Sequence, residues 1–148
     1  MAAPILLLTH SGDYFTIDRV AEAIAKRGMT PMRLNTDLFP RDYRLEVRAG
    51  ERGIAPTLRD KSGAAIELAS IRAAWCRRLW VAAKMAPDLE PQFVAHCQRE
   101  SRLLFHDVLA CMRTTTFINN PQAQQMAERK IFQLQMAADI GLTLPDTL

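Results

Sequence analysis

Residues 5–34 read ILLLTHSGDYFTIDRVAEAIAKRGMTPMRL, and this stretch decides the fold. Residues 5–8 form a continuous apolar run, which is typical of a parallel strand buried on both faces. Residues 16–27 place apolar side chains on one helical stripe, and Gly28 provides the usual C-terminal stop. Residues 31–34 form a second short strand. A strand–helix–strand unit of this kind packs as a right-handed parallel crossover, so the chain opens as an α/β fold.

The next segment has the pattern of an antiparallel β-meander. Apolar and charged residues alternate over residues 43–49, and two further short strands are expected at 54–59 and 65–68. Turns containing glycine separate the three segments. Alternation with such turns favours antiparallel strands that have one face in water. We therefore predict a meander over residues 43–68, inserted beside the parallel sheet.

The remaining segments return to the α/β pattern. Strands are expected at 71–79 and 115–118, and amphipathic helices at 91–112 and 122–140. The predicted architecture is an open, Rossmann-like α/β sheet, mostly parallel, with the inserted meander and a trailing C-terminal helix. The apolar face of that helix (Ile131, Leu134 and Ala138) should pack on its own sheet or on a second copy of the chain.

Composition narrows the class of protein. The 148 residues suffice for one domain with a real core, and the 19 cationic and 16 anionic side chains are interleaved. Binding to nucleic acid is therefore not expected, although the pI is near 9.0. Three cysteines without a C-x-x-C pair fit a reducing compartment, and neither a signal peptide nor a membrane span is evident. We expect a cytoplasmic protein.

Polar residues follow the predicted parallel strands at residues 9–13, 35–37, 77–78 and 119–120. Ligands of open α/β sheets bind beyond the carboxyl ends of such strands, where the loops converge. The candidates for contact with a substrate or an anion are Ser11, Asp13, Asp37, Arg77 and Arg78. Helix capping and turn formation explain most of these residue types equally well when each is taken separately.

The arginine pair admits two interpretations. A guanidinium at the end of an apolar strand needs a partner, which is either a bound carboxylate or phosphate or an internal acid such as Asp37 or Asp13. The usual motifs offer no further help, because neither G-x-G-x-x-G nor a Walker loop follows the first strand. His10, His96 and His106 lack the spacing of metal ligands. We assign no catalytic and no metal-binding residue.

Four segments together resemble a known family: ILLLTHSGDYFTIDRVAEAI at 5–24, NTDLFP at 35–40, AAWCRR at 73–78, and the closing stretch that starts with NNPQAQQ at 119. They are similar to the N-terminal part of ATP-grasp peptide ligases, above all the microviridin-type (graspetide) maturases, which cross-link ribosomal peptides through side-chain ester or amide bonds. The likeness covers nearly the whole chain.

The resemblance implies a pre-ATP-grasp domain over residues 1–120, followed at 121–148 by a linking helix and the start of a missing ATP-grasp domain. In such ligases ATP phosphorylates a carboxylate, and a nucleophile attacks the acyl phosphate. ATP and Mg²⁺ are thus the implied cofactors of the full-length enzyme. No cofactor is expected in this chain alone, which should be inactive. The implied partner is a precursor peptide, and a homodimer is possible. The resemblance carries only Lys130 over, as a contact to the nucleotide phosphates.

Two other classes stay open. The chain could be a stand-alone, non-enzymatic module that binds a peptide or protein at an exposed edge of the meander. A receiver-like or flavodoxin-like domain is a weaker alternative, because no acidic pair adjoins the first strand. Residues 147–148, after Pro145, are expected to begin a further strand, as they would at the opening of a second domain.

Overall fold

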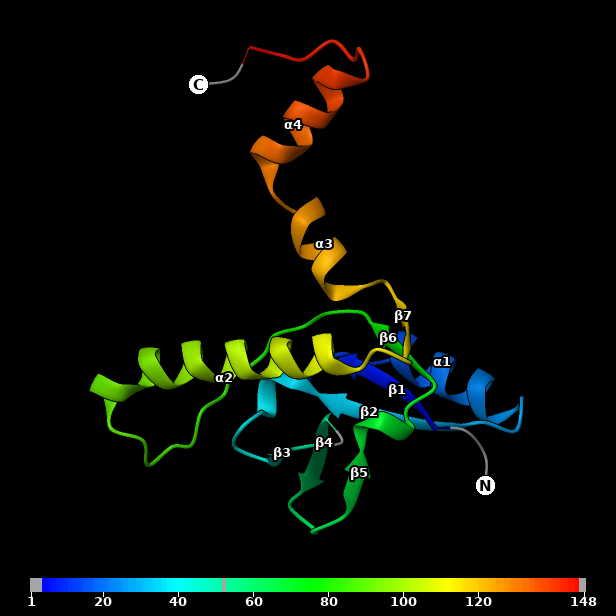
Figure 1. The fold of residues 1–148 in the computed structure, drawn as a ribbon, viewed down its shortest axis with the longest axis vertical. Coiled ribbons are helices and arrows are strands. Elements are labelled where there is room, and N and C mark those ends of the chain that lie inside the picture. The colour runs from blue at the N-terminus through cyan, green and yellow to red at the C-terminus, as the bar shows by residue number, and fades with distance from the viewer. Residues whose placement is uncertain (1–3, 52, 147–148) are drawn as a thin grey trace.

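The computed structural model describes residues 4–51 and 53–146, and its centre is a four-stranded parallel sheet (Figure 1). The strands are β1 (Pro4–Thr9), β2 (Thr30–Asn35), β6 (Ala73–Cys76) and β7 (Thr116–Ile118), in the order β2-β1-β6-β7. Leu6 of β1 lies opposite Met32 on one side and Ala74 on the other. The apolar run thus forms an inner strand, and the predicted Rossmann-like sheet is confirmed.

The two faces of β1 supply two parts of the core. Leu6 and Leu8 join the main apolar cluster, which also contains Phe105 and Leu109 of α2 (Pro91–Cys111). Leu7 points to the opposite face, on which α1 (Thr16–Ala25) packs, and Ile17 of α1 is fully buried. Each such side chain contributes roughly 1.5–3 kcal/mol when it leaves water. The helices therefore hold β1 from both sides.

The meander forms a separate sheet of three antiparallel strands, as predicted. Its strands are β3 (Tyr43–Gly50), β4 (Gly53–Asp60) and β5 (Ala65–Glu67), in the order β3-β4-β5. Leu58 enters the main core, whereas Arg59 stays on the outer side and pairs with Glu46 at 2.9 Å. The short turns η1 (Thr36–Leu38) and η2 (Leu68–Ser70) connect this sheet to the parallel one.

The expected single helix at 122–140 is wrong. The structure has two helices, α3 (Pro121–Ala127) and α4 (Lys130–Asp139), separated at Glu128–Arg129. Figure 1 shows α4 extending away from both sheets, and none of its residues is buried. The apolar residues of α4 are distributed around the helix rather than along one stripe, so it has no single face that would draw it onto the body.

The expectation that this helix packs on its own sheet is therefore also wrong. Ile131 has 85% of its surface exposed. Packing on a second copy is untested by a single chain. The strand expected to begin at residues 147–148 lies outside the described residues. Among the described helices, none is both long enough and apolar enough to cross a membrane.

Candidate functional site

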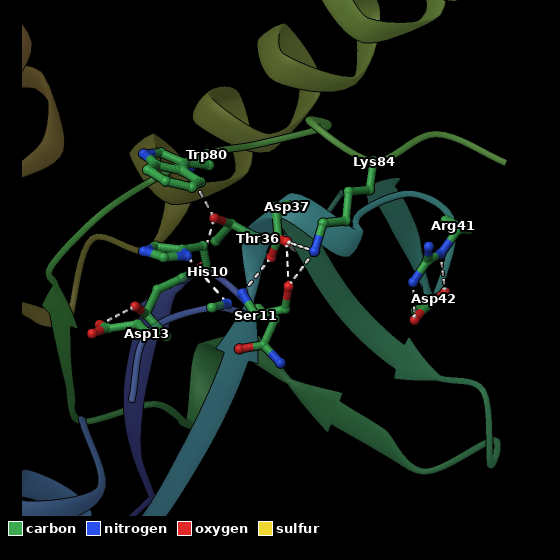
Figure 2. A network of polar contacts seen from close by, with 12 residues as sticks. His10, Ser11, Asp13, Thr36, Asp37, Arg41, Asp42, Trp80 and Lys84 are labelled. Atoms are coloured by element: carbon green, nitrogen blue, oxygen red, sulfur yellow. Dashed lines mark hydrogen bonds and ion pairs between the residues drawn. The ribbon is translucent and has the colours of Figure 1, made fainter. Parts of the chain in front are cut away.

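Three of the four predicted polar clusters lie together at the carboxyl ends of β1, β2 and β6. Figure 2 shows the clusters after β1 and β2. The loops that follow these strands contact one another through side-chain and backbone hydrogen bonds. The fourth cluster, after β7, has a capping role: Asn120 Oδ1 accepts hydrogen bonds from the backbone amides of Gln122 (3.0 Å) and Ala123 (3.1 Å) and so starts α3. For Asn120 the capping interpretation is confirmed.

Asp37 is the centre of one half of the cluster. Its carboxylate accepts hydrogen bonds from the backbone amide (2.7 Å) and hydroxyl (2.6 Å) of Ser11, and Lys84 Nζ lies 3.0 Å away. Lys84 also donates to the Ser11 hydroxyl at 2.5 Å. Burial alone would raise the pKa of Asp37, but the Ser11 and Lys84 contacts outweigh it and hold the pKa below its usual value. Asp37 is therefore ionised and joins three loops.

Asp13 is the centre of the other half. It accepts hydrogen bonds from Thr9 Oγ1 at 2.5 Å and from Arg77 Nε at 2.8 Å. Burial opposes ionisation, yet the bonds from Thr9 and Arg77 lower the pKa of this carboxyl. β6 ends at Cys76, three residues before the predicted end, so Arg77 belongs to the loop and turns toward Asp13. Of the two interpretations of Arg77, an internal ion pair with Asp13 is present.

Arg33 and Thr36 connect these loops through hydrogen bonds to backbone groups. Arg33 Nη2 donates to the carbonyl oxygens of His10 (3.2 Å) and Asp13 (2.7 Å), and Thr36 Oγ1 donates to the carbonyl of Thr9 (2.8 Å). The Thr36 hydroxyl also accepts the backbone amide of Trp80 at 3.1 Å. Thr36 lies in the predicted cluster at residues 35–37 without being a named candidate, and Arg33 was not predicted at all. The available signal was an arginine within the otherwise apolar second strand, which needs a partner.

His10 lies beneath Trp80, and their rings stack at 3.9 Å with an interplanar angle of 12°. The His10 side chain is almost entirely buried. Its Nδ1 accepts the backbone amide of Gly12 at 3.2 Å, which places the ring proton of the neutral imidazole on Nε2. Nε2 is the only buried side-chain nitrogen or oxygen without a hydrogen-bond partner in residues 4–51 and 53–146. His10 belongs to the predicted polar cluster at residues 9–13, but the sequence gives no sign of its stack with Trp80.

A cavity of about 500 Å³ opens beside this stack. Its walls come from the loop after β6, from α2 and from α3 with the residue that follows it. The polar or aromatic residues that line it are Arg77, Arg78, Trp80, His106, Gln124, Gln125 and Glu128. Arg78 makes no hydrogen bond or ion pair with any residue that the structure describes. Within the same part of the chain, no group of three or more metal-ligating side chains is present. The cavity offers N–H donors and is suited to an anion.

Lys130 makes no hydrogen bond or ion pair with these loops among the described residues. It is the first residue of α4, exposed, and its Nζ donates to Gln133 Oε1 at 3.2 Å. Among the other candidates, Ser11, Asp13, Asp37 and Arg77 are brought together, and Arg78 faces the adjacent cavity. Their suggested contacts with a substrate or an anion stay predictions.

The fold and this edge of the sheet define an α/β domain of the kind that precedes an ATP-grasp core. The family model for the MvdD pre-ATP-grasp domain matches residues 4–125, and the chain belongs to this family. A search of curated proteins gives no match.

Several solved structures are similar to the chain. The macrocyclase MdnB from Microcystis aeruginosa MRC is 39% identical, with a TM-score of 0.84 over 98% of this chain and 47% of that one. MdnC from the same organism, bound with the precursor peptide MdnA, is 28% identical, with a TM-score of 0.84 over 98% of this chain and 46% of that one.

A Chryseobacterium gregarium ATP-grasp ligase associated with ribosomally synthesised, modified peptides is also similar. Its structure is a complex with ADP and a leader and core peptide, and it is 27% identical, with a TM-score of 0.81 over 100% of this chain and 44% of that one. The chain thus spans slightly less than half the length of these solved chains.

Proposed function

We propose that this chain is the N-terminal domain of an ATP-dependent ligase that joins a carboxylate of a ribosomally made peptide to an amine or a hydroxyl. The observation that carries the proposal is the 39% identity to the macrocyclase MdnB over 98% of the chain. The domain would comprise residues 1–120, and residues 121–148 would link it to an ATP-grasp core. The acyl-phosphate chemistry would take place in that core.

ATP and Mg²⁺ are the proposed cofactors of the whole enzyme. Related solved ligases contain ADP, and one of them, PsnB, contains Mg and ADP. The described residues of this chain contain no acidic cluster that could hold the metal. We therefore assign both cofactors chiefly to the ATP-grasp core and expect this chain alone to be inactive. Lys130, on the freely extending α4, is the residue proposed to reach the nucleotide phosphates.

The proposed role of the domain itself is to form one wall of the reaction cleft. The loops after β1, β2 and β6 are held by ion pairs from Asp13 and Asp37 and by hydrogen bonds from Arg33. Loops fixed in this manner present side chains to a ligand at little entropic cost. The carboxyl edge of the sheet is the face that would meet the peptide.

ATP turnover tests the proposal. The 148-residue chain should neither bind nor hydrolyse Mg-ATP measurably, whereas the complete product of the gene should do both and should modify a precursor peptide. In the complete enzyme, Lys130→Gln should raise the KM for ATP, and Lys26→Gln, at the C-terminal end of α1, should not. ATP turnover by the 148 residues alone would count against the proposal.

A second candidate, a non-enzymatic module that binds a peptide or protein, is favoured by one observation. α3 and α4 expose large apolar side chains (Met126, Ile131, Phe132, Met136 and Ile140). Exposed apolar surface of this kind associates with a partner or a second copy. Size-exclusion chromatography at several concentrations would reveal a homodimer, and a tight partner that binds without ATP would favour the module. The three free cysteines support a cytoplasmic location under either function.

A further inference from the structure

We propose that the cavity beside the His10–Trp80 stack is a carboxylate-binding site, in which Arg78 and Arg77 hold an acidic side chain of the peptide substrate. The identity of the ligand as a peptide rests on the proposed function. The site itself rests on the geometry of the cavity and on its unpaired donors. The cavity, at about 500 Å³, has room for one acidic side chain and its neighbours.

The two guanidinium groups differ in their engagement. Arg77 uses Nε to pair with Asp13, and its Cζ lies 5.7 Å from the centre of the Trp75 ring, so the group is oriented while its terminal nitrogens stay unpaired among the described residues. Arg78 is exposed and makes no hydrogen bond or ion pair in that part of the chain. Arginine forks match a carboxylate in geometry and charge.

Trp80 adds an indole N–H donor to the cavity, whose wall it lines while about half exposed. Its ring is held in place by the stack on the buried ring of His10, which Figure 2 shows beneath it. His10 itself does not line the cavity. A donor on a side chain that is already fixed binds a ligand at little entropic cost.

Charge favours a carboxylate over the triphosphate of ATP. The cavity wall carries Arg77 and Arg78 against the single acid Glu128, and Asp13 behind Arg77 offsets part of the remaining positive charge. Glu128 is held back by a hydrogen bond from Gln124 at 3.0 Å. The wall alone has one net positive charge, which a single carboxylate neutralises, and with Asp13 counted the surroundings are formally neutral. The several negative charges of a triphosphate would therefore stay uncompensated close to Glu128.

NMR titration of the ¹⁵N-labelled chain tests the site. The probes are the blocked tripeptide acetyl-Ala-Glu-Ala-amide, its glutamine counterpart and ATP without metal, and the signals followed are the indole N–H of Trp80, assigned with Trp80→Phe, and the arginine side chains. The glutamate peptide should shift these signals. Arg78→Gln should weaken its binding at least about tenfold, because a hydrogen bond to a charged group is lost.

Arg72→Gln is the matched control, since Arg72 is exposed and precedes β6 at the opposite edge of the sheet. It should change the affinity less than about twofold. Equal shifts with the glutamine peptide, equal effects of Arg72→Gln and Arg78→Gln, or tighter binding of ATP than of the glutamate peptide would each overturn the site. Because binding is measured without turnover, a failed titration would refute only this site, and a failed ligase assay would refute only the proposed function.

Discussion

Asp37→Asn should destabilise the chain markedly, although it changes only the charge of one side chain. Asp37 is 1% exposed and accepts two hydrogen bonds from Ser11 besides its ion pair with Lys84. An asparagine oxygen can still accept the Ser11 amide. Its NH₂ group, however, would face the ammonium of Lys84, so the charge-assisted contact is lost.

The magnitude follows from these contacts. The Ser11 hydroxyl loses its charged acceptor, because it donates to the same carboxylate oxygen that Lys84 contacts and an NH₂ group cannot accept a hydrogen bond. Loss of a hydrogen bond to a charged group costs about 1.5–3 kcal/mol, and the remaining bond from the Ser11 amide weakens when its acceptor becomes neutral. We expect a loss of about 2–3 kcal/mol of unfolding free energy and a fall in Tm of about 4–12 °C. Lys84→Gln should cost only about 0.5–1 kcal/mol, because the Lys84 side chain is 53% exposed and its ion pair is screened by water.

Urea unfolding at pH 7, followed by circular dichroism, measures these differences. Asp88→Asn is the control of identical chemistry, because Asp88 is exposed and outside the ion pairs of the site; it should lie within about 0.5 kcal/mol of the native chain. In the double variant of Asp37 and Lys84 the two losses should be less than additive. If Asp37→Asn and Asp88→Asn were equally stable, the structural role of the buried carboxylate would be refuted.

Acid should destabilise the chain through the same carboxyl. Because folding lowers the pKa of Asp37, its contribution to stability is complete above the ordinary pKa of about 3.9 and is lost as the pH falls through the lower folded value. Urea titrations from pH 5 to 2 should therefore show a steep loss of unfolding free energy, and Asp37→Asn should make that loss shallower. Burial raises the pKa of Cys76 to about 12, so iodoacetamide should label Cys76 only after unfolding, whereas the exposed Cys111 should react in the native state. Mass spectrometry after brief labelling measures this, and equal labelling of the two cysteines would contradict it. Ile131→Glu should leave the unfolding free energy unchanged within about 0.5 kcal/mol, whereas Leu8→Ala, at a fully buried position, should lower it by about 2–5 kcal/mol. A large effect of Ile131→Glu in urea unfolding at low protein concentration would mean that α4 packs on the body.

The fold was predictable because its strongest signals are local. The apolar run of β1 predicts burial on both faces, and the structure agrees. The alternation over residues 43–49 predicts burial on one face, which holds for the half-buried Tyr43 and Leu45 but not for the exposed Val47. The predicted end of β6 is three residues too late. The apolar run is followed by Arg77, Arg78 and Leu79, and nothing local in the sequence indicates that the strand ends at Cys76. The split between α3 and α4 was missed for a similar reason: Glu128 and Arg129 are ordinary helix residues by propensity.

The site was predictable in position and only partly in detail. The rule that loops converge at the carboxyl ends of parallel strands predicts from the sequence that Ser11, Asp13 and Asp37 lie together. Which acid pairs with which cation depends on distances in space between residues that are far apart in the sequence. Arg77 and Asp13, for example, are separated by 64 residues, and their separation in the sequence does not predict that they meet. For the same reason, the sequence does not predict the contacts of Lys84 and Arg33 or the stack of His10 on Trp80.

The strand order has a consequence for how this chain is made. β1 is synthesised before its two neighbours, β2 and β6, which begin at Thr30 and Ala73. The side of β1 that pairs with β6 therefore stays unpaired until the three-stranded sheet between β2 and β6 has been synthesised. The β1–α1–β2 segment can close early, because its contacts are near in sequence, whereas docking of β6 requires a long loop to close. Nascent chains arrested before residue 73 should therefore leave an open flank on β1 that a chaperone recognises, and release of that chaperone should coincide with the emergence of β6.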